Sequence, residues 1–482
     1  MAEAFNFETK HVCEGCISEP YLRKVIEILD NGQCDYCMDA NIKVIPLPDL
    51  AIRVESAFDK HYQRTSPEPD DFEYAMIKDK EIEYDWYRKG DPVLELLTSL
   101  LSCSEEIARD VLDLLADKHD INDWGDTSEC EFGRDSYYEM KEISIGSWND
   151  KWNILERDLK HENRYFNKQL FDLFESVFDG VDKAKSYNDE LAIISVGPKT
   201  DFSTLYRARE FNTPEDVGKA LEKPVESLGP PPSDKARANR MNPSGVSIFY
   251  GAQDEKSALA EIRPAVGSYV VVSKFEVTRP IRLLDLRALD KLIPHGSVFD
   301  PDFFIEREKI GFLRTLGNRL ISPVMPGDQA HGYLITQAVA DYLARLECPS
   351  LDGIIYKSVQ DGIGANVALF RKSSLVEPLK LEKDTEIVPE LYDFDFETGT
   401  AYPYFRLYLK RKLVSNKNSQ LNRLVDTNSA NDRSPALKLV LDSVTVHSVT
   451  SVEIKSIKER VSIIHNSEVE ESGYDIDAAE DF

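Results

Sequence analysis

Four cysteines near the start of the chain constrain its fold more strongly than any other feature of the sequence. They form two pairs, Cys13-x2-Cys16 and Cys34-x2-Cys37, separated by seventeen residues. Each pair presents two sulfur atoms from one short turn, and the segment between the pairs is long enough to return and close a tetrahedron. This is the usual spacing of a tetrathiolate zinc site, and such a site leaves no open position for water. We therefore expect a structural zinc ion.

Two other interpretations of these cysteines are weaker. Buried free thiols or a catalytic thiol would not require this spacing, and a total of seven cysteines in a long chain is poorly explained by a disulfide framework. His11 lies next to the cluster, but a complete set of four thiolates has no need of it. We predict that His11 is a surface residue.

Composition excludes several classes of protein. The 482 residues predict two to four domains, and 42% hydrophobic with 30% charged residues is typical of a globular chain. The mean hydropathy is −0.38, and neither a membrane-spanning run nor a secretory signal is recognisable, so a cytoplasmic protein is expected. The chain has 58 Lys and Arg against 86 Asp and Glu, a net charge of −28. This charge would repel a phosphate backbone, which makes nucleic acid an unlikely partner.

Changes in the hydrophobic pattern along the sequence divide the chain into four regions. After the zinc-binding element of residues 1–50, residues 51–190 repeat apolar side chains at intervals of three and four, which predicts a helical domain. Arg157 and His161 lie one helical turn apart there, and we interpret them as solvated surface residues. From 191 to 465, short apolar strands alternate with short helices, which predicts an α+β domain closed by strands in 436–456. The final segment, 466–482, is an acidic tail.

Within the α+β region, several polar residues have no obvious structural duty. The proline-rich segment 221–247 has the length of a functional loop. Glu261 follows an apolar helical stretch, SALA, where a carboxylate needs a partner or a substrate. The candidate residues as a group are Arg207, Arg240, Tyr250, Glu261, Ser358 and Asn366.

These residues lie in three of four segments that occur in a familiar order: LYRARE, RANRMNPSGVSIFYGAQDEKSALAEIRP, YLITQAVADYL and DGIIYKSVQDGIGANVALF. The series, with its core in residues 205–370, resembles the RES domain, which is named for Arg, Glu and Ser positions. The resemblance implies a fold similar to ADP-ribosyltransferase toxins. The helical region before it is similar to HEPN-type domains that are fused to RES domains. Arg157-x3-His161 is shorter than the HEPN nuclease pattern, so we expect that region to regulate, assemble or sense.

The RES resemblance implies an enzyme that consumes NAD+. Its nicotinamide–ribose bond would be cleaved with inorganic phosphate as the acceptor, and loss of NAD+ would make the protein a toxin or anti-phage effector. Hydrolysis of NAD+ and transfer of ADP-ribose to a macromolecule are alternatives, and a zinc-stabilised scaffold is the non-enzymatic one. An antitoxin or other regulatory protein and a homo-oligomer are the expected partners.

The same resemblance implies roles for the candidate residues. Arg207 and Arg240 would clamp the pyrophosphate or seat the phosphate, because planar guanidinium groups suit such anions. Glu261 would stabilise an oxocarbenium-like state or hold the ribose hydroxyls. Tyr250 would stack on or hydrogen-bond the nicotinamide, and Ser358 with Asn366 would position ribose or phosphate oxygens.

Three other motifs are set aside. Gly362-x-Gly364 lacks the third glycine and the βαβ unit of a dinucleotide fingerprint. His331 is interpreted as a cap or surface residue. Arg209 lies two residues after Arg207 on a predicted strand, so both side chains would point to the same face. The family alignment favours Arg207.

Overall fold

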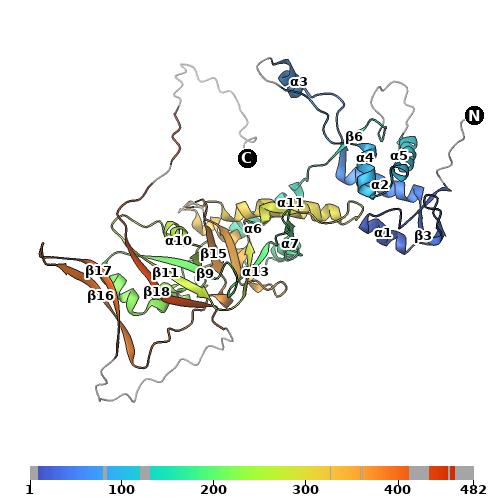
Figure 1. The fold of residues 1–482 in the computed structure, drawn as a ribbon. Helices are drawn as coiled ribbons and strands as arrows, with labels where there is room; N and C mark the ends of the chain where they lie inside the picture. Colours follow the sequence, from blue (N-terminus) through green and yellow to red (C-terminus); the bar gives the residue numbers. More distant parts are fainter. Residues whose placement is uncertain are drawn as a thin grey trace, which may run out of the picture.

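The computed structural model describes residues 9–79, 84–119, 131–325, 327–358, 360, 362–411, 434–453 and 456–461. The ribbon shows an N-terminal part on one side and a large sheet with its helices on the other, with helix α11 (Phe303–Ile321) running between them (Figure 1). The predicted mixture of helices and sheet is confirmed. The segment 413–433 and the predicted acidic tail of 466–482 lie outside the described residues.

The N-terminal part combines the cysteine element with helices in one apolar core. Val12 and Ile17, next to the first cysteine pair, are fully buried together with Leu50 and Leu97 from the following helices. The predicted element of residues 1–50 therefore packs into the helices that follow it. The elements of this part are β1 (His11–Cys13), α1 (Pro20–Glu27), β2 (Asn31–Gln33), β3 (Ala40–Pro46), α2 (Leu47–His61), β4 (Tyr62–Arg64), α3 (Asp71–Lys78), β5 (Asp91–Pro92), α4 (Val93–Leu101), α5 (Glu105–His119) and β6 (Tyr137–Met140).

An eight-stranded mixed sheet forms the second part. In spatial order its strands are β18 (Leu437–Ser448), β11 (Tyr269–Val277), β9 (Thr204–Phe211), β10 (Phe249–Ala252), β15 (Ala365–Leu369), β14 (Gly353–Lys357), β12 (Ile281–Asp285) and β8 (Ile193–Val196). Strand β12 pairs with β14 in parallel, and the other neighbours pair antiparallel. Part of the segment predicted to supply the closing strands, 436–456, forms one edge strand of this sheet, since β18 pairs with β11 along its length.

Two different sets of elements cover the two faces of the sheet. On one face, α6 (Gly146–His161), α7 (Lys168–Phe178), α11 and α13 (Leu334–Arg345) share a core with Ile354 and Ala368. On the other face, α8 (Pro214–Glu222), α9 (Pro224–Leu228) and the hairpin β16–β17 (Thr385–Asp395 and Thr400–Arg411) pack over Val367 and Phe275. Alternate residues of each strand point to opposite faces, which explains why Val367 and Ala368 belong to different cores.

Helices α6 and α7 pack with the sheet, although their periodicity groups them with the helical region of 51–190. Trp148 and Trp152 are buried and contact Phe312 of α11, with ring centroids 5.7 and 5.5 Å apart. A helical repeat shows that a helix buries one face, but it carries no information about which partner covers that face. Residues 221–247 differ from a simple loop, because they contain α9 and the short 3-10 helix Ser233–Lys235.

A buried polar contact joins the two parts of the molecule. Nη1 of Arg307, on α11, lies 2.9 Å from Nδ1 of His61 at the end of α2, and Nη2 donates to the carbonyl oxygen of Lys141 at 2.8 Å. His61 is fully buried, and Phe303 and Phe304 lie against its ring. Burial, followed by the charges of Arg307, Lys60 and Lys141, lowers the pKa of His61 to about 4. The imidazole is therefore neutral at pH 7.

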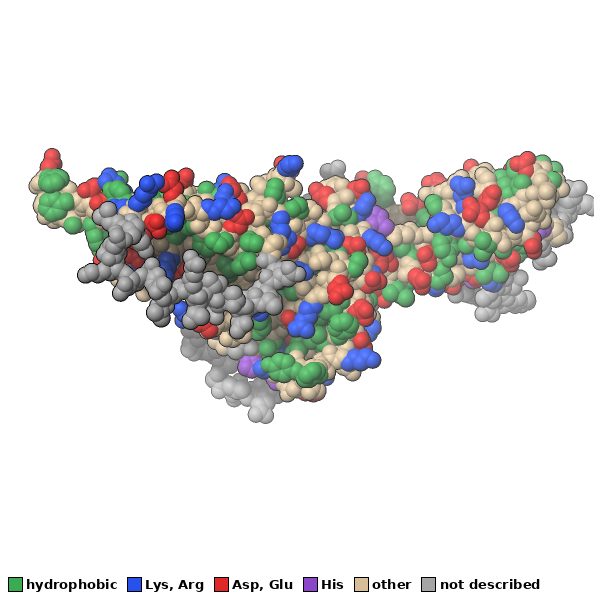
Figure 2. Space-filling model, turned by 90° about the horizontal axis from the view of Figure 1, so that it is seen from below, with side chains coloured by type: hydrophobic (Ala, Val, Ile, Leu, Met, Phe, Trp, Pro, Cys, Tyr) green, Lys and Arg blue, Asp and Glu red, His purple; other side chains and the backbone are tan. Residues whose placement is uncertain are grey.

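The surface carries both signs of charge. On the face shown in Figure 2, acidic and basic side chains are interspersed over both parts of the molecule. Among the described residues, no helix is both long and apolar enough to cross a membrane.

Candidate functional site

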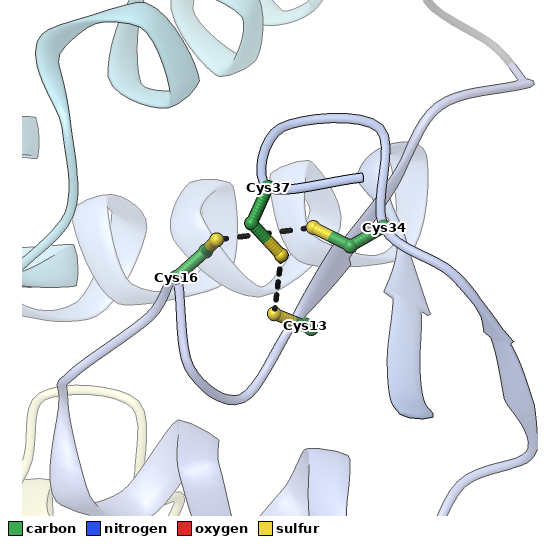
Figure 3. A group of neighbouring side chains, drawn as sticks. All are labelled: Cys13, Cys16, Cys34 and Cys37. Atoms are coloured by element: carbon green, nitrogen blue, oxygen red, sulfur yellow. Dashed lines mark hydrogen bonds between the residues drawn. The ribbon is translucent and has the colours of Figure 1, made fainter. Parts of the chain in front are cut away.

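The two cysteine pairs converge as the sequence predicts. Cys13 ends β1 and Cys34 follows β2, and these two strands flank β3 in a three-stranded sheet. The pairing brings the two turns together, so that the sulfurs of Cys13, Cys16, Cys34 and Cys37 point toward a common centre (Figure 3). All four sulfur atoms lie within 4.8 Å of one another.

The geometry of the cluster fits a tetrahedral metal ion. The Sγ atoms are 3.6 Å apart for Cys13 and Cys37 and 3.8 Å apart for Cys16 and Cys34. A tetrahedron with zinc–sulfur bonds of about 2.3 Å has edges of about 3.8 Å. The cluster is thus compatible with a zinc site. His11 is outside the cluster, and its backbone nitrogen donates to Asp35 at 2.7 Å.

The cluster is also tied to the helices around it. The hydroxyl of Tyr36, inside the second cysteine turn, donates to Asp110 Oδ2 of α5 at 2.7 Å. Nζ of Lys10 lies 2.6 Å from the same oxygen. Loss of the turn would deprive Asp110, which is buried, of its hydrogen bond from Tyr36. A metal ion here would therefore hold the packing of the whole N-terminal part.

Far along the chain, a cavity of about 490 Å³ opens between the sheet and helices α10 (Glu255–Ile262) and α12 (Gln329–Gly332). Five of the six predicted residues line it: Arg207, Arg240, Tyr250, Glu261 and Asn366. They come from β9, a loop, β10, α10 and β15, and their sequence positions span 160 residues. Only the tertiary fold brings them together.

An opening in the sheet creates the place for Arg207. Strands β9 and β10 share a single register pair, Tyr206 with Ala252. Gly251 permits this close approach, since an added Cβ would lie 3.1 Å from the carbonyl oxygen of Tyr206 on β9. Beyond the pair the strands separate, and Nη1 of Arg207 donates to the carbonyl oxygen of Tyr250 at 2.7 Å. The guanidinium thus satisfies a carbonyl that the neighbouring strand has left unpaired.

Arg207 is held in a setting that favours an anion. Its guanidinium lies over the ring of Phe249, 5.0 Å from the centroid, and its Nε is buried without a hydrogen-bond partner. Burial, and then the positive charge of Arg209, lower the pKa of Arg207 to about 9. The group still carries its charge at pH 7, and a bound anion would offset both unfavourable contributions.

The guanidinium of Arg240 makes hydrogen bonds to backbone carbonyl oxygens. Its Nη1 donates to the carbonyl oxygens of Leu320 and Ser322, at the end of α11, at 2.9 and 3.0 Å. Its guanidinium lies 5.2 Å from the ring centroid of Tyr333. Cations are stabilised at the C-terminus of a helix. The helix end therefore fixes Arg240 at the cavity wall.

The hydroxyl of Tyr250 makes its hydrogen bonds within the protein. It donates to Asn242 Oδ1 at 2.8 Å and accepts from the backbone nitrogen of Met241 at 3.0 Å. Asn242 is itself buried and donates to the carbonyl oxygens of Arg237 and Val246. The hydroxyl therefore holds the loop that carries Arg240, and the ring of Tyr250 is what remains for a ligand.

Glu261 and Asn366 form a pair across the cavity wall. Nδ2 of Asn366 donates to Glu261 Oε2 at 2.7 Å. Asn366 is buried, whereas Glu261 is exposed on the open side of α10. The bond fixes the orientation of the amide, because a reversed amide would place two oxygens in contact. It leaves Oδ1 of Asn366 buried without a partner.

Ser358, the sixth predicted residue, is fully buried and is not among the lining residues. Its backbone nitrogen donates to Gly364 O, and its carbonyl oxygen accepts from Gly362 N, so it closes the turn between β14 and β15. The residues set aside earlier are also away from the cavity: His331, Arg157 and His161 are all exposed.

Sequence reasoning missed three tyrosines that line the cavity: Tyr206, Tyr333 and Tyr356. Tyr356 occurs in IIYKS and Tyr333 directly before LITQ, both inside the segments that carried the resemblance. An aromatic residue on a strand is usually part of a core, so residue type gave no reason to separate these tyrosines from packing residues.

A second cavity, of about 820 Å³, adjoins the first and shares Arg207, Asn239 and Tyr250 with it. Five basic residues line it: Arg207, Arg209, Lys219, Lys235 and Arg237. Three acidic residues, Glu210, Asp216 and Glu226, do so as well. Arg209 faces this second cavity and donates to Gly229 O at 3.2 Å. Arg207 is the arginine common to both cavities.

Comparison with protein families finds a match in the second part of the chain. A RES domain is found at residues 204–386, which include β9 to β15, both cavities and all six predicted residues. A RES domain is consistent with an NAD+-utilising, toxin-like activity. No curated protein and no solved structure matches the chain significantly.

Proposed function

We propose that this chain cleaves the nicotinamide–ribose bond of NAD+, with inorganic phosphate as the acceptor, and so depletes NAD+ as a toxin or anti-phage effector. The observation that carries the proposal is the first cavity. There the carboxylate of Glu261 accepts a hydrogen bond from the amide of Asn366, and Arg207 and Arg240 line the same cavity. The cavity lies inside a RES domain. A fold similar to ADP-ribosyltransferases is part of the same proposal.

The chemistry needs one anionic group near the ribose and cations near the phosphates. The bond between the ribose anomeric carbon and the pyridinium nitrogen breaks, and its electron pair leaves with nicotinamide, which becomes neutral. The ribose then carries positive charge, which Glu261 would stabilise. A phosphate oxygen forms the new bond and gives ADP-ribose-1″-phosphate. Since nicotinamide leaves neutral, the step needs no general acid.

The two adjoining cavities suit a dinucleotide. NAD+ has two nucleoside ends joined by a pyrophosphate, and the cavities of about 490 and 820 Å³ meet at Arg207. We place the nicotinamide riboside in the first cavity, with Glu261. The pyrophosphate would lie at Arg207, and the adenosine end would extend toward Arg209 and Lys235. Arginine forks bind phosphate oxygens in pairs, which suits this central position.

The zinc ion at the four cysteines belongs to the same proposal as a structural component. In this chain the cluster lies in the N-terminal core and not in the wall of either cavity. Bound zinc would supply a closed crosslink between two turns and no reactive position. The N-terminal part would then act in regulation or assembly, and an antitoxin or second copy of the chain would be its partner.

The test is incubation of the purified full chain with NAD+, with and without phosphate, followed by chromatography. Phosphate-dependent ADP-ribose-1″-phosphate with nicotinamide is expected. Free ADP-ribose would instead indicate a glycohydrolase, and label retained on protein or nucleic acid would indicate a transferase. Wild-type protein that consumes no NAD+ under any of these conditions would contradict the proposal.

Glu261→Gln is the matched variant for this test. We expect kcat/KM to fall about 10³-fold, which corresponds to about 4 kcal/mol of lost transition-state stabilisation. The thermal unfolding temperature should stay unchanged, because Glu261 is exposed and the amide can still accept from Asn366. Glu255→Gln is the control, since Glu255 lies on the same helix and contacts His447 instead. Equal losses in both variants would show that the helix matters and the carboxylate does not.

A further inference from the structure

Tyr356 is the most enclosed of the polar side chains in the first cavity that lack a described partner. It lies on β14, in register with Asn366 on β15, and antiparallel register partners point to the same face of a sheet. Only 5% of its surface is exposed, and it lines the cavity. Within the described part of the chain, its hydroxyl makes no hydrogen bond.

A hydroxyl on so enclosed a side chain that lines a cavity is suited to a hydrogen bond with a ligand or water in that cavity. The other tyrosine of this wall, Tyr250, shows the contrast, because its hydroxyl has both a donor and an acceptor in the loop. Burial, and then the charge of Glu261, raise the pKa of Tyr356 well above its ordinary value. The phenol is therefore a permanent hydrogen-bond donor at pH 7.

Asn366 presents the complementary group beside it. Its Nδ2 is committed to Glu261, so its Oδ1 can only accept, and that oxygen is buried without a partner. The wall thus offers one donor and one acceptor on adjacent strands. A carboxamide carries an acceptor oxygen and a donor NH2 group, which is the matching set. A carboxylate carries two acceptors and a negative charge, and it would meet Asn366 Oδ1 and the Glu261 carboxylate.

We infer that Tyr356 and Asn366 select the carboxamide of the nicotinamide ring, with Tyr356 donating to its oxygen and Asn366 Oδ1 accepting from its nitrogen. This inference rests on the proposed function. It makes Tyr356 a specificity-determining residue that discriminates NAD+ from nicotinic acid adenine dinucleotide, in which a carboxylate replaces the amide. The ring of the substrate would then lie against β14 and β15, with its ribose toward Glu261.

The experiment compares kcat/KM for NAD+ and for nicotinic acid adenine dinucleotide, first in the wild-type full chain. We expect NAD+ to be preferred at least about 100-fold, because a site built to pair polar groups strongly rejects a ligand that leaves them unpaired. Equal turnover of the two dinucleotides would overturn this inference and leave the proposed function intact. If neither is consumed, the proposed function fails and this inference fails with it.

Tyr356→Phe sharpens the test. It should lower kcat/KM for NAD+ about 10-fold or more and affect the carboxylate substrate less, so the ratio of the two narrows. A purely structural role would lower both values equally and would overturn the assignment. Tyr342→Phe is the matched control, since Tyr342 packs on Phe174 and Phe178 away from the cavity. In the Tyr342→Phe variant, the ratio of kcat/KM for NAD+ to kcat/KM for nicotinic acid adenine dinucleotide should equal that of the wild type.

Discussion

The four-cysteine cluster and the cavity are assembled in opposite ways. The cluster draws its ligands from 25 consecutive positions, Cys13 to Cys37, and a three-stranded sheet brings the two turns together. The cavity draws Arg207 and Asn366 from positions 159 residues apart, and it exists because β9 and β10 separate after one register pair. A local site can be recognised from spacing, whereas a non-local site needs the strand order.

The two sites also differ in what supports them. Around the cluster, Tyr36 and Lys10 attach the turns to a helix through Asp110, so the site and the packing are one unit. Around the cavity, the support comes from backbone carbonyls and a loop asparagine, which hold Arg207, Arg240 and Tyr250 in place. We therefore expect changes at the cluster to affect folding and changes at the cavity to affect turnover.

The largest expected effect is loss of the cluster. Cys34→Ser should abolish stoichiometric zinc and unfold the N-terminal part, since a structural zinc site contributes on the order of 10 kcal/mol of binding free energy. Metal content and far-UV circular dichroism would measure both effects. Cys348→Ser is the control, because Cys348 is exposed and outside the cluster. Retention of stoichiometric zinc by the Cys34 variant would contradict the assignment of Cys34 as a zinc ligand.

A smaller effect is expected at the contact between the two parts, His61 with Arg307. The folded state keeps His61 neutral down to about pH 4, whereas an unfolded histidine takes up a proton below about pH 6.5. The unfolded state then binds more protons, so stability falls as the pH falls through this window. The loss between pH 7 and pH 5 should be about 2 kcal/mol.

Chemical denaturation at both pH values would measure this loss. The variant His61→Gln removes the titrating group, and its stability difference between pH 7 and pH 5 should be smaller than that of the wild type by that amount. Carboxylates that titrate in the same range are common to both proteins and cancel. An identical pH dependence in the two proteins would contradict a neutral buried His61.

The smallest effect is expected on the surface of α6. The double variant Arg157→Ala and His161→Ala should consume NAD+ at the wild-type rate. Its free energy of unfolding should change by no more than about 0.5 kcal/mol, because both side chains are exposed. Turnover assays and thermal unfolding would measure this. A loss of activity against RNA in the double variant would show that the helical region is a nuclease and that its exposed pair is functional.

Prediction from the sequence succeeded where the information is local. The spacing of the cysteines, the strand at LYRARE and the helix at SALAEI are all found as expected. Where a residue has two possible roles, the sequence left both open. Tyr250 was expected to stack on or to hydrogen-bond the nicotinamide, and its hydroxyl is bound to Asn242. The hairpin β16–β17 was not anticipated, although its strands are long.

By itself the sequence singled out the candidate residues: four thiols at metal spacing, and arginines, a glutamate and an asparagine within segments that match a RES domain. Tertiary structure decided how they are used. The single pair between β9 and β10 places Arg207 between two cavities, the end of α11 fixes Arg240, and the register of β14 with β15 sets Tyr356 beside Asn366. Spacing along a chain specifies a local turn, but register and helix docking are set by packing between distant segments.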